Sequence, residues 1–430
     1  MVSQRQISLG RVLVVGGCGM LGSHFVEQLL NFPNENTQSA ANGVSDSTQT
    51  SKLLRSRTGR STLPHSSEFQ YPSSKSRYPK YVNTEVHVLD LRCVKNRYEG
   101  ATYHEADITS ADALLAIFQK VKPDVIFHTA SPVFDSPKPI LYKVNVGGTR
   151  TLLEVAGGEH GDWGGVCKAF VYTSSSSVIH DNQTDLVNAD ERYPVIRPNL
   201  VEYYSETKGE ADELVLQSNN KFQGMLTCSL RPAGIIGERD VQYSYKVLQH
   251  AIAAPSWQLR MQLGDNENLF DLTYAGNIAL AHFLAAERLL MTHKRVAEGG
   301  IPPLSHEKVD GEAFMITNDN TVTFWDATFF LWSLLGKVVE PSQVIALNEG
   351  FAMPLGMLAQ AVTTMMGRES KFTPQTVRFS CMRRYFNCSK AKQRLGYRPL
   401  IGLEEALIRS CKSFLEQEEA KVPAATKKEQ

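Results

Sequence analysis

The sequence lacks paired cysteines, a surplus of either charge and any cluster of metal-ligand residues. Its seven cysteines are scattered and form no C-x-x-C pair, so we expect reduced thiols and a cytosolic environment. Basic and acidic residues number 45 each, which gives no indication of a nucleic-acid partner. No histidine, cysteine and carboxylate residues have the spacing of a metal site, so we expect no metal. With 42% apolar residues in 430, the chain can bury the core of a large α/β unit or of two or three domains.

A clear membrane-spanning run is also missing. The first apolar segment, RVLVVGG, leads into glycines rather than a cleavage site, so we expect no signal peptide. The longest uncharged stretch, 350–367, is at the lower length limit for a span and contains Pro354. A second apolar stretch, 323–336, is rich in aromatic residues. Each stretch is consistent with a membrane-surface contact or with an ordinary buried helix.

A glycine-rich turn follows the first apolar strand. Residues 11–22 read RVLVVGGCGMLG, which predicts a buried parallel strand, a tight turn and the start of a helix. Glycines permit close approach of the backbone to a pyrophosphate, and the helix directs its positive end at the phosphates. The predicted cofactor-binding residues of this turn are Gly16, Gly19, Met20, Leu21 and Gly22.

The acidic residue expected about 20 positions after such a turn is displaced. Residues 34–83 are rich in Ser, Asn, Thr and Arg, which predicts a disordered insertion. The second strand then reads EVHVLDLR and ends near Asp90. A carboxylate there binds the adenosine ribose hydroxyls and repels a 2′-phosphate, so it favours NAD over NADP. Arg92 weakens that preference, because an arginine can accept the phosphate.

Further strand ends follow in the order expected of a doubly wound parallel sheet. Asp107 and Ile108 follow a short strand, where the adenine is expected, and Ala130 and Ser131 follow the apolar strand PDVIFHTASP. Asn145 lies in the next helix and is expected to face inward. These strand ends and Asn145 are predicted cofactor contacts, and the alternation of strands with helices predicts an α/β, Rossmann-type fold.

Tyr204 and Lys208 are four positions apart in YYSETKGEADEL, so a helix would place them on one face. A fixed positive charge beside a phenol lowers its pKa from about 10, which would let Tyr204 take a proton from an alcohol. By chance alone, roughly one such pair is expected in a chain of this composition. A serine run, 174–177, follows the preceding strand, and a hydroxyl there can bind the substrate oxygen or simply stabilise a turn.

In this order, the motifs resemble those of the extended short-chain dehydrogenase/reductases, specifically the 3β-hydroxysteroid dehydrogenase family. The likeness covers most of 11–415 outside the insertion and is strongest for the decarboxylating enzymes of sterol C4 demethylation. The segments that carry it are GGCGMLG (16–22), LDLR (89–92), DIT (107–109), HTASP (128–132), NVGGT (145–149), YTSSSSVI (172–179), YYSETK (203–208), RPAGIIGERD (231–240), LFDLTYAGNIALAHFLAAE (269–287), GEAFMITNDNTVTFW (311–325) and YFNCSKAKQRLGYRPLIGLEEAL (385–407).

The resemblance implies a role for each catalytic candidate. Tyr204 would be the general acid/base, and Lys208 would lower its pKa and bind the nicotinamide ribose. The backbone near Arg231 would line the nicotinamide. Ser175 would be the catalytic serine because it stands three residues before Val178, as in the family's S-x-x-V pattern. The neighbouring serines at 174 and 176 stay open as alternatives.

The resemblance also implies a domain layout. An NAD-binding Rossmann domain would span 11–230, and a smaller, mainly substrate-binding region would span 231–415 and be partly interleaved with the sheet. The segment 416–430 reads as a charged tail. Its last residues, KKEQ, resemble a dilysine retrieval signal of endoplasmic reticulum membrane proteins, with a solvated charged tail as the alternative.

The implied reaction is NAD-dependent oxidation of the 3β-hydroxyl of a 4α-carboxysterol, with loss of the carboxylate as CO₂. The implied partners are the sterol, a membrane on the cytosolic face of the endoplasmic reticulum, other C4-demethylation enzymes and a second copy of the chain. Three alternatives are a triterpenoid or meroterpenoid substrate, a nucleotide-sugar epimerase or dehydratase, and an NAD-sensing scaffold protein. The apolar C-terminal half favours a lipid substrate over a sugar nucleotide, and the intact Ser, Tyr and Lys set argues against a scaffold.

Overall fold

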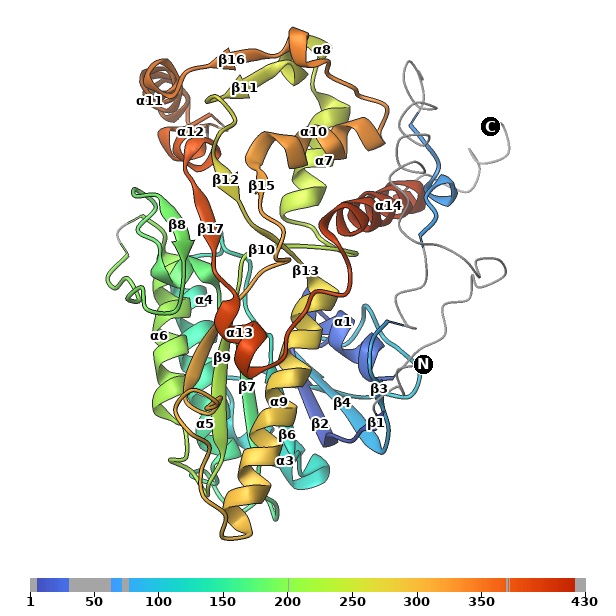
Figure 1. The fold of residues 1–430 in the computed structure, drawn as a ribbon, viewed down its shortest axis with the longest axis vertical. Helices are drawn as coiled ribbons and strands as arrows, with labels where there is room; N and C mark the ends of the chain where they lie inside the picture. The colour runs from blue at the N-terminus through green and yellow to red at the C-terminus, as the bar shows by residue number, and fades with distance from the viewer. Residues whose placement is uncertain are drawn as a thin grey trace.

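The computed structural model describes residues 6–30, 63–71, 77–199, 201–368, 370 and 372–421. Its centre is a seven-stranded parallel sheet in the order β14-β9-β7-β6-β2-β4-β5 (Figure 1). The predicted α/β fold with a doubly wound parallel sheet is therefore confirmed. The strands are β2 (Gly10–Val15), β4 (Thr84–Asp90), β5 (Thr102–Glu105), β6 (Val125–His128), β7 (Ala169–Thr173), β9 (Leu226–Pro232) and β14 (Glu312–Ile316).

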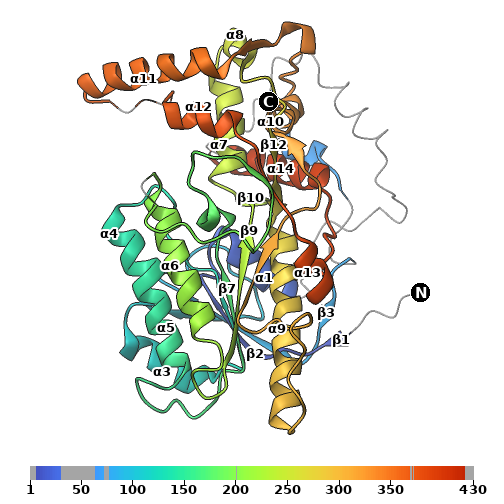
Figure 2. The same ribbon diagram turned by 60° about the vertical axis from the view of Figure 1, so that its left-hand side comes forward.

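Helices cover both faces of the sheet (Figure 2). Alternate residues of β2 point to opposite faces, so Val12 and Val14 join one core with Phe25, while Leu13 and Val15 join the other. One layer holds α1 (Met20–Leu29) and α9 (Ala275–Ala297). The other holds α3 (Ala111–Val121), α4 (Lys138–Leu141), a π-helical turn η2 (Tyr142–Gly148), α5 (Thr149–Ala156) and α6 (Tyr203–Gln217).

The later part of the chain packs over the carboxyl edge of the sheet. Its core is one apolar cluster that joins residues from 236 to 415. The small sheet β15-β12-β17-β8 links it to the first half. In that sheet, β8 (Leu186–Ala189) comes from the first half. The elements of the later part are β10 (Gly234–Ile236), α7 (Tyr243–Ala253), α8 (Ser256–Leu259), β11 (Met261–Leu263), β12 (Leu269–Phe270), β13 (Leu272–Tyr274), β15 (Val322–Thr323), α10 (Phe324–Leu334), β16 (Ile345–Leu347), α11 (Glu349–Met365), α12 (Pro374–Cys381), β17 (Arg384–Phe386), α13 (Ser389–Arg394) and α14 (Leu403–Lys421).

The prediction of disorder across 34–83 is wrong for the described parts of that segment, 63–71 and 77–83. Phe69 and Tyr78 are buried, and β3 (Lys80–Tyr81) pairs with β1 (Gln6–Ile7). The turn η1 (Ser66–Glu68) is bound to α14, where the Ser66 amide and hydroxyl donate to Glu419. Its few aromatic residues thus dock this part of the segment on the body. The end of α14 at Lys421 likewise shows that the first residues of the predicted tail are helical, while KKEQ lies outside the described residues.

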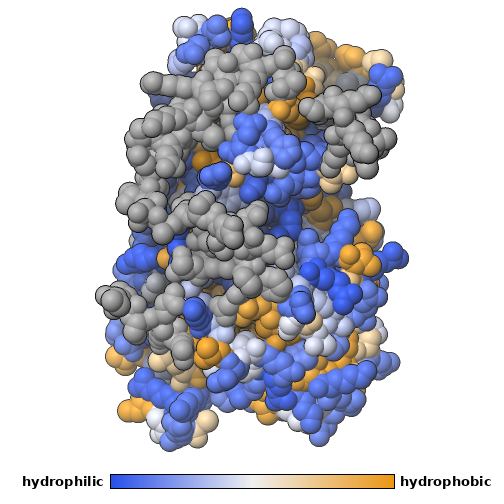
Figure 3. Space-filling view, turned by 90° about the vertical axis from the view of Figure 1, so that its right-hand side faces the viewer, coloured by the Kyte–Doolittle hydropathy of each residue, from blue (hydrophilic) through white to orange (hydrophobic). Residues whose placement is uncertain are grey.

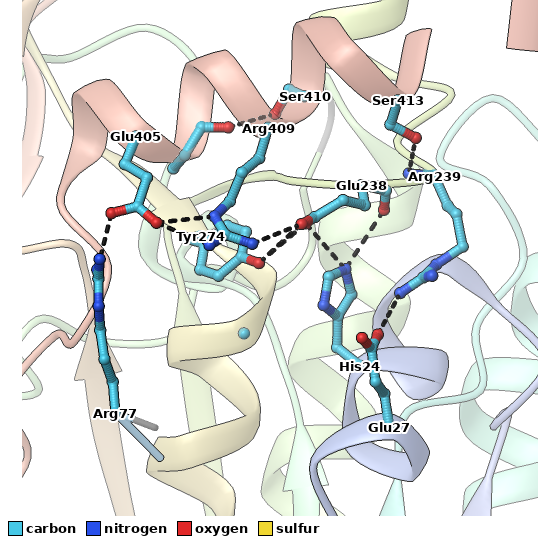
Figure 4. A network of polar contacts seen from close by, with 12 residues as sticks. His24, Glu27, Arg77, Glu238, Arg239, Tyr274, Glu405, Arg409, Ser410 and Ser413 are labelled. Atoms are coloured by element: carbon cyan, nitrogen blue, oxygen red, sulfur yellow. Dashed lines mark hydrogen bonds and ion pairs between the residues drawn. The ribbon is translucent and has the colours of Figure 1, made fainter. Parts of the chain in front are cut away.

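A buried polar network ties α14 to α1 (Figure 4). Glu238 accepts hydrogen bonds from the Tyr274 hydroxyl and from Arg409, and His24 lies 3.8 Å from its carboxylate. Burial alone would raise the pKa of Glu238, but His24, Arg409 and Arg239 lower it to about 2. The ionised carboxylate therefore holds the C-terminal helix, α9 and the helix after the glycine turn in one arrangement.

The two apolar stretches behave differently. The aromatic stretch forms α10, where Leu331 and Trp332 are buried against α7 and α14, so the buried-helix interpretation is confirmed for it. The uncharged stretch forms α11, where only Ala352 and Gly356 are buried. Among the described helices, none combines the length and apolar character needed to cross a bilayer.

Candidate active site

The glycine turn leaves room for a ligand at the start of α1. Gly16 has φ +84°, and a Cβ there would lie 2.6 Å from the Ala130 amide nitrogen. A Cβ at Gly22 would lie 2.2 Å from the Gly16 carbonyl oxygen, so the turn and the helix can meet only through glycine. The N-cap Gly19 offers no side chain to the first amides of α1, around Met20 and Leu21, and the first turn holds no acidic residue. These amides are available to an anion.

Two predicted cofactor contacts, Asp90 and Asp107, lie at or just after the ends of the neighbouring strands β4 and β5. The Asp90 carboxylate accepts hydrogen bonds from the Cys18 amide at 3.0 Å and the Leu91 amide at 2.8 Å. Asp90 therefore fixes the glycine turn to the end of β4. Asp107 accepts hydrogen bonds from Thr109 and, at 3.1 Å, from Lys143, while Ile108 is buried beside it.

A chain of hydrogen bonds leads from β6 to α6. The Ser131 hydroxyl donates to the Asn145 side-chain oxygen at 2.9 Å, and the Asn145 amide donates to the Thr207 hydroxyl at 3.0 Å. Ser131 also lowers the pKa of the Tyr204 hydroxyl, so the two side chains are neighbours. The structure thus brings together two predicted cofactor contacts and the predicted acid/base. Asn145 faces inward, as predicted, from the π-helical turn η2.

Tyr204 and Lys208 lie on α6, but their electrostatics differ from the prediction. The Lys208 ammonium donates to the Thr173 carbonyl at 2.6 Å and lies 4.3 Å from the centre of the Tyr172 ring. Burial lowers the pKa of Lys208 to about 7, against the opposing effect of Asp212. Burial raises the pKa of Tyr204 to about 12, with Glu202 adding to the rise and Ser131 opposing it. The predicted lowering of the Tyr204 pKa by Lys208 is therefore wrong here, because desolvation dominates.

The serine run turns directly after β7. The Ser175 hydroxyl bonds the Ser177 hydroxyl at 2.9 Å and accepts from the Ser177 amide at 3.2 Å, which caps the short helix η3 (Ser176–Ile179). The Ser174 hydroxyl is buried and has no hydrogen-bond partner in the described part of the chain. Ser175 has a turn-forming role besides any catalytic one, and Ser174 has a free hydroxyl, so the assignment of the catalytic serine stays a prediction.

We expect Ser175→Ala to lower kcat about 10²-fold, as the loss of one hydrogen-bond donor to a developing oxyanion does. Ser174→Ala is the matched control at the neighbouring position, and we expect it to change kcat less than threefold. Steady-state kinetics with the substrate proposed below measure both values. A larger loss for Ser174→Ala than for Ser175→Ala would transfer the role to Ser174.

The Arg231 side chain takes no part in the site. It forms a buried ion pair with Asp212 of α6 at 2.5 Å, and the Ser229 hydroxyl bonds the same carboxylate. The pair ties β9 to α6, one turn beyond Lys208. The predicted cofactor contact from the backbone near Arg231 stays a prediction.

Arg384 is a buried cation near the site that the sequence analysis did not predict. Its guanidinium lies 4.3 Å from the ring centre of Phe379 and 5.0 Å from that of Phe270. Burial lowers its pKa to about 10, and Glu202 and Tyr243 oppose that shift, so it remains a cation at neutral pH. Among the described residues it has no ion-pair partner. Glu202 acts electrostatically on both Arg384 and Tyr204, which places all three in one region.

The residues fit a dinucleotide cofactor. The bare turn and open amides at the start of α1 suit a pyrophosphate, and Asp90 suits a ribose with two free hydroxyls. All of these groups lie at the carboxyl edge of the sheet, where the strand order reverses between β2 and β6.

Comparison with known proteins agrees with this geometry. A family profile described as the 3-beta hydroxysteroid dehydrogenase/isomerase family matches residues 80–347. The chain is 36% identical to a sterol-4-alpha-carboxylate 3-dehydrogenase, decarboxylating, of Saccharomyces cerevisiae, over 75% of this chain and 88% of that protein. It is 34% identical to a protein of the same description from Candida albicans, over 93% of this chain and 96% of that protein.

Solved structures share the fold at low identity. The UDP-glucose 4-epimerase of Thermotoga maritima is similar with a TM-score of 0.59 and 19% identity, over 96% of this chain and all of that one. That of Thermus thermophilus, solved with NAD, has a TM-score of 0.56 and 17% identity, over 95% of this chain and 98% of that one.

Proposed function

The chain belongs to the 3-beta hydroxysteroid dehydrogenase/isomerase family and is an oxidoreductase, and from that premise we propose that it oxidises the 3β-hydroxyl of a 4α-carboxysterol and releases the carboxylate as CO₂. The observation that carries this proposal is Arg384. Arg384 is a cation that forms no ion pair with any of the described residues, and it packs against aromatic rings. It is in electrostatic range of Glu202, which lies two residues before the proposed base. An apolar substrate with one carboxylate matches those surroundings.

In the first step, Tyr204 would remove the proton of the C3 hydroxyl, and a serine hydroxyl of the 174–177 run would hold the oxygen. A bound nicotinamide cofactor would supply the acceptor for the hydride that leaves C3. In its oxidised form it would also supply a positive charge beside the site. Ser131, which lowers the pKa of Tyr204, would stabilise the tyrosinate that accepts the hydroxyl proton. Since burial holds the pKa of Tyr204 at about 12, added positive charge would help to form the tyrosinate.

In the second step, the C4–carboxylate bond of the resulting β-keto acid would break. The electron pair would move toward the new C3 carbonyl, and CO₂ would leave. Arg384 would hold the carboxylate in place until the bond breaks, and the serine hydroxyl would stabilise the enolate oxygen. Tyr204 could then return its proton to C4, which leaves the 3-ketosterol.

Asp90 supports NAD as the cofactor, because its carboxylate would repel a 2′-phosphate. We expect Asp90→Ser to reduce the preference for NAD over NADP at least about tenfold, since a like charge next to a phosphate costs several kcal/mol. The ratio of kcat/KM values for the two cofactors measures it. Asp112→Asn, an exposed carboxylate on α3, is the control and should leave the ratio unchanged. An unchanged ratio in Asp90→Ser would contradict the assignment.

A sterol enters water poorly, so we propose that the enzyme works at a membrane, namely the cytosolic face of the endoplasmic reticulum. The sterol in the names of the yeast relatives supports the membrane part of this proposal. The proposed reaction is tested by incubating the protein and NAD with a 3β-hydroxy-4α-carboxysterol and, in parallel, with UDP-glucose. NADH should form in the incubation with the sterol and not in the incubation with UDP-glucose. Turnover of UDP-glucose and not of the sterol would reject the sterol assignment.

A further inference from the structure

The helix α11 presents its large apolar side chains to solvent. Phe351, Leu355, Leu358, Val362 and Met365 recur at intervals of three and four residues, so they form one stripe along the helix. All five are exposed, from Val362 at 46% to Met365 at 88%. The helix is therefore apolar on the side that a soluble protein normally makes polar.

The side of α11 that faces the protein carries small residues. Ala352 and Gly356 are its buried positions, and a Cβ at Gly356 would lie 3.0 Å from the backbone carbon of Thr373, the N-cap of α12. The contact with α12 thus fixes the helix by its backbone and leaves the stripe outside. In Figure 2, α11 extends sideways beyond the rest of that end of the molecule.

Other apolar side chains are exposed at the same end. Trp257 of α8 is 63% exposed and Ile345 of β16 is 58% exposed, and both elements lie at the top of the molecule with α11 (Figure 1). On the side of the molecule seen in Figure 3, apolar patches lie between hydrophilic residues wherever the surface is coloured. The exposed apolar surface therefore includes more than the helix itself.

No charged side chain interrupts the apolar stripe of α11. Residues 350–367 contain none, and Glu349 is paired with Arg378 at 3.0 Å. Exposed charges of both signs lie in or next to the other elements of this end, namely Arg260, Lys337 and Arg368 and the carboxylates of Asp265, Glu267, Asp326 and Glu340. An uninterrupted apolar stripe flanked by polar and charged residues is the pattern of a helix that lies in the plane of a membrane.

A bilayer accounts for these features better than a second copy of the chain. A stable protein interface buries about 800 Å² on each partner over a fitted surface, whereas α11 is one projecting helix. The helix also rests on α12, which carries Phe379, the ring closest to Arg384. We propose that α11 is a bilayer-docking helix whose stripe inserts into the headgroup–acyl boundary and holds the substrate site beside the membrane. The choice of a bilayer rests in part on the proposed lipid substrate.

The test is flotation of the full chain with vesicles of phosphatidylcholine and phosphatidylserine, without substrate or cofactor. We expect the triple variant Leu355→Glu, Leu358→Glu, Met365→Glu to bind vesicles at least about tenfold more weakly, since each change removes buried apolar area. Met291→Glu is the matched control, because Met291 is 51% exposed on α9, far from α11, and should bind like the wild type.

Vesicle binding that the triple variant retains would overturn the proposal, as would a wild-type chain that fails to float. Sedimentation velocity tests the alternative that a second copy of the chain covers α11. If the wild type forms a dimer, the triple variant does not, and the wild type fails to bind vesicles, this face is a contact between copies. Because flotation needs no turnover, its outcome is independent of the proposed reaction. A detergent-dispersed sterol assay separates the two, since the triple variant should turn over that substrate at the wild-type rate.

Discussion

Tyr204→Phe should lower kcat for NADH formation by about 10²–10⁴-fold, the usual contribution of a positioned general acid/base. The ring stays in place while the hydroxyl, whose pKa Ser131 lowers, is lost. Cofactor binding should change little, because the glycine turn and Asp90 are on other elements. Stopped-flow measurement of hydride transfer, together with NAD binding by fluorescence, separates the two effects.

The matched control is Tyr203→Phe, the preceding tyrosine of the same helix. Tyr203 lies beneath Lys138, with the ammonium 5.2 Å from its ring centre, and has no role in the proposed relay. The Tyr203→Phe variant should therefore retain the wild-type rate of NADH formation within about twofold. Equal rates for Tyr204→Phe and the wild type would remove Tyr204 from the mechanism, and a strong effect in Tyr203→Phe would reassign the base.

Arg384→Gln should lower kcat/KM for a 4α-carboxysterol by roughly 30- to 5,000-fold, because removing one member of a buried charge pair costs about 2–5 kcal/mol. The loss should be much smaller for the same 3β-hydroxysterol without the carboxylate. That difference isolates the proposed contact from any general damage to the aromatic surroundings, where Arg384 stacks on Phe270 and Phe379.

Arg383→Gln is the control for this pair of assays. Arg383 is the adjacent residue and is exposed, so its substitution should leave kcat/KM unchanged for both sterols. Thermal melting of both variants checks that the fold is intact. An equal loss on the two sterols in Arg384→Gln would give Arg384 a structural role and take away the main support for a carboxylated substrate.

The parts of the site that depend on local spacing could be predicted from the sequence. The glycine turn, Asp90 and the Tyr204–Lys208 pair each follow from positions within one strand, turn or helix, and the structure places them at the carboxyl edge of the sheet. Their arrangement follows because parallel strands bring their carboxyl ends to one edge.

The parts that depend on long-range contacts could not be predicted. Arg384 belongs to a three-residue strand that pairs with β8, nearly 200 residues earlier, so nothing local distinguishes it from Arg383. The raised pKa of Tyr204 likewise depends on burial by distant segments. In the 34–83 segment, the polar average composition predicted disorder. The few aromatic residues in it, such as Phe69 and Tyr78, are buried against the rest of the protein, and their presence in the sequence could have indicated an ordered part.

The most direct test of the whole proposal is a parallel measurement of NADH and CO₂ from one 4α-carboxysterol, with the carboxyl carbon labelled. The proposed mechanism predicts equal amounts of the two products from the wild type and neither from Tyr204→Phe, because decarboxylation requires the C3 ketone. Release of labelled CO₂ without NADH, or NADH from the wild type with the label retained in the sterol, would contradict it.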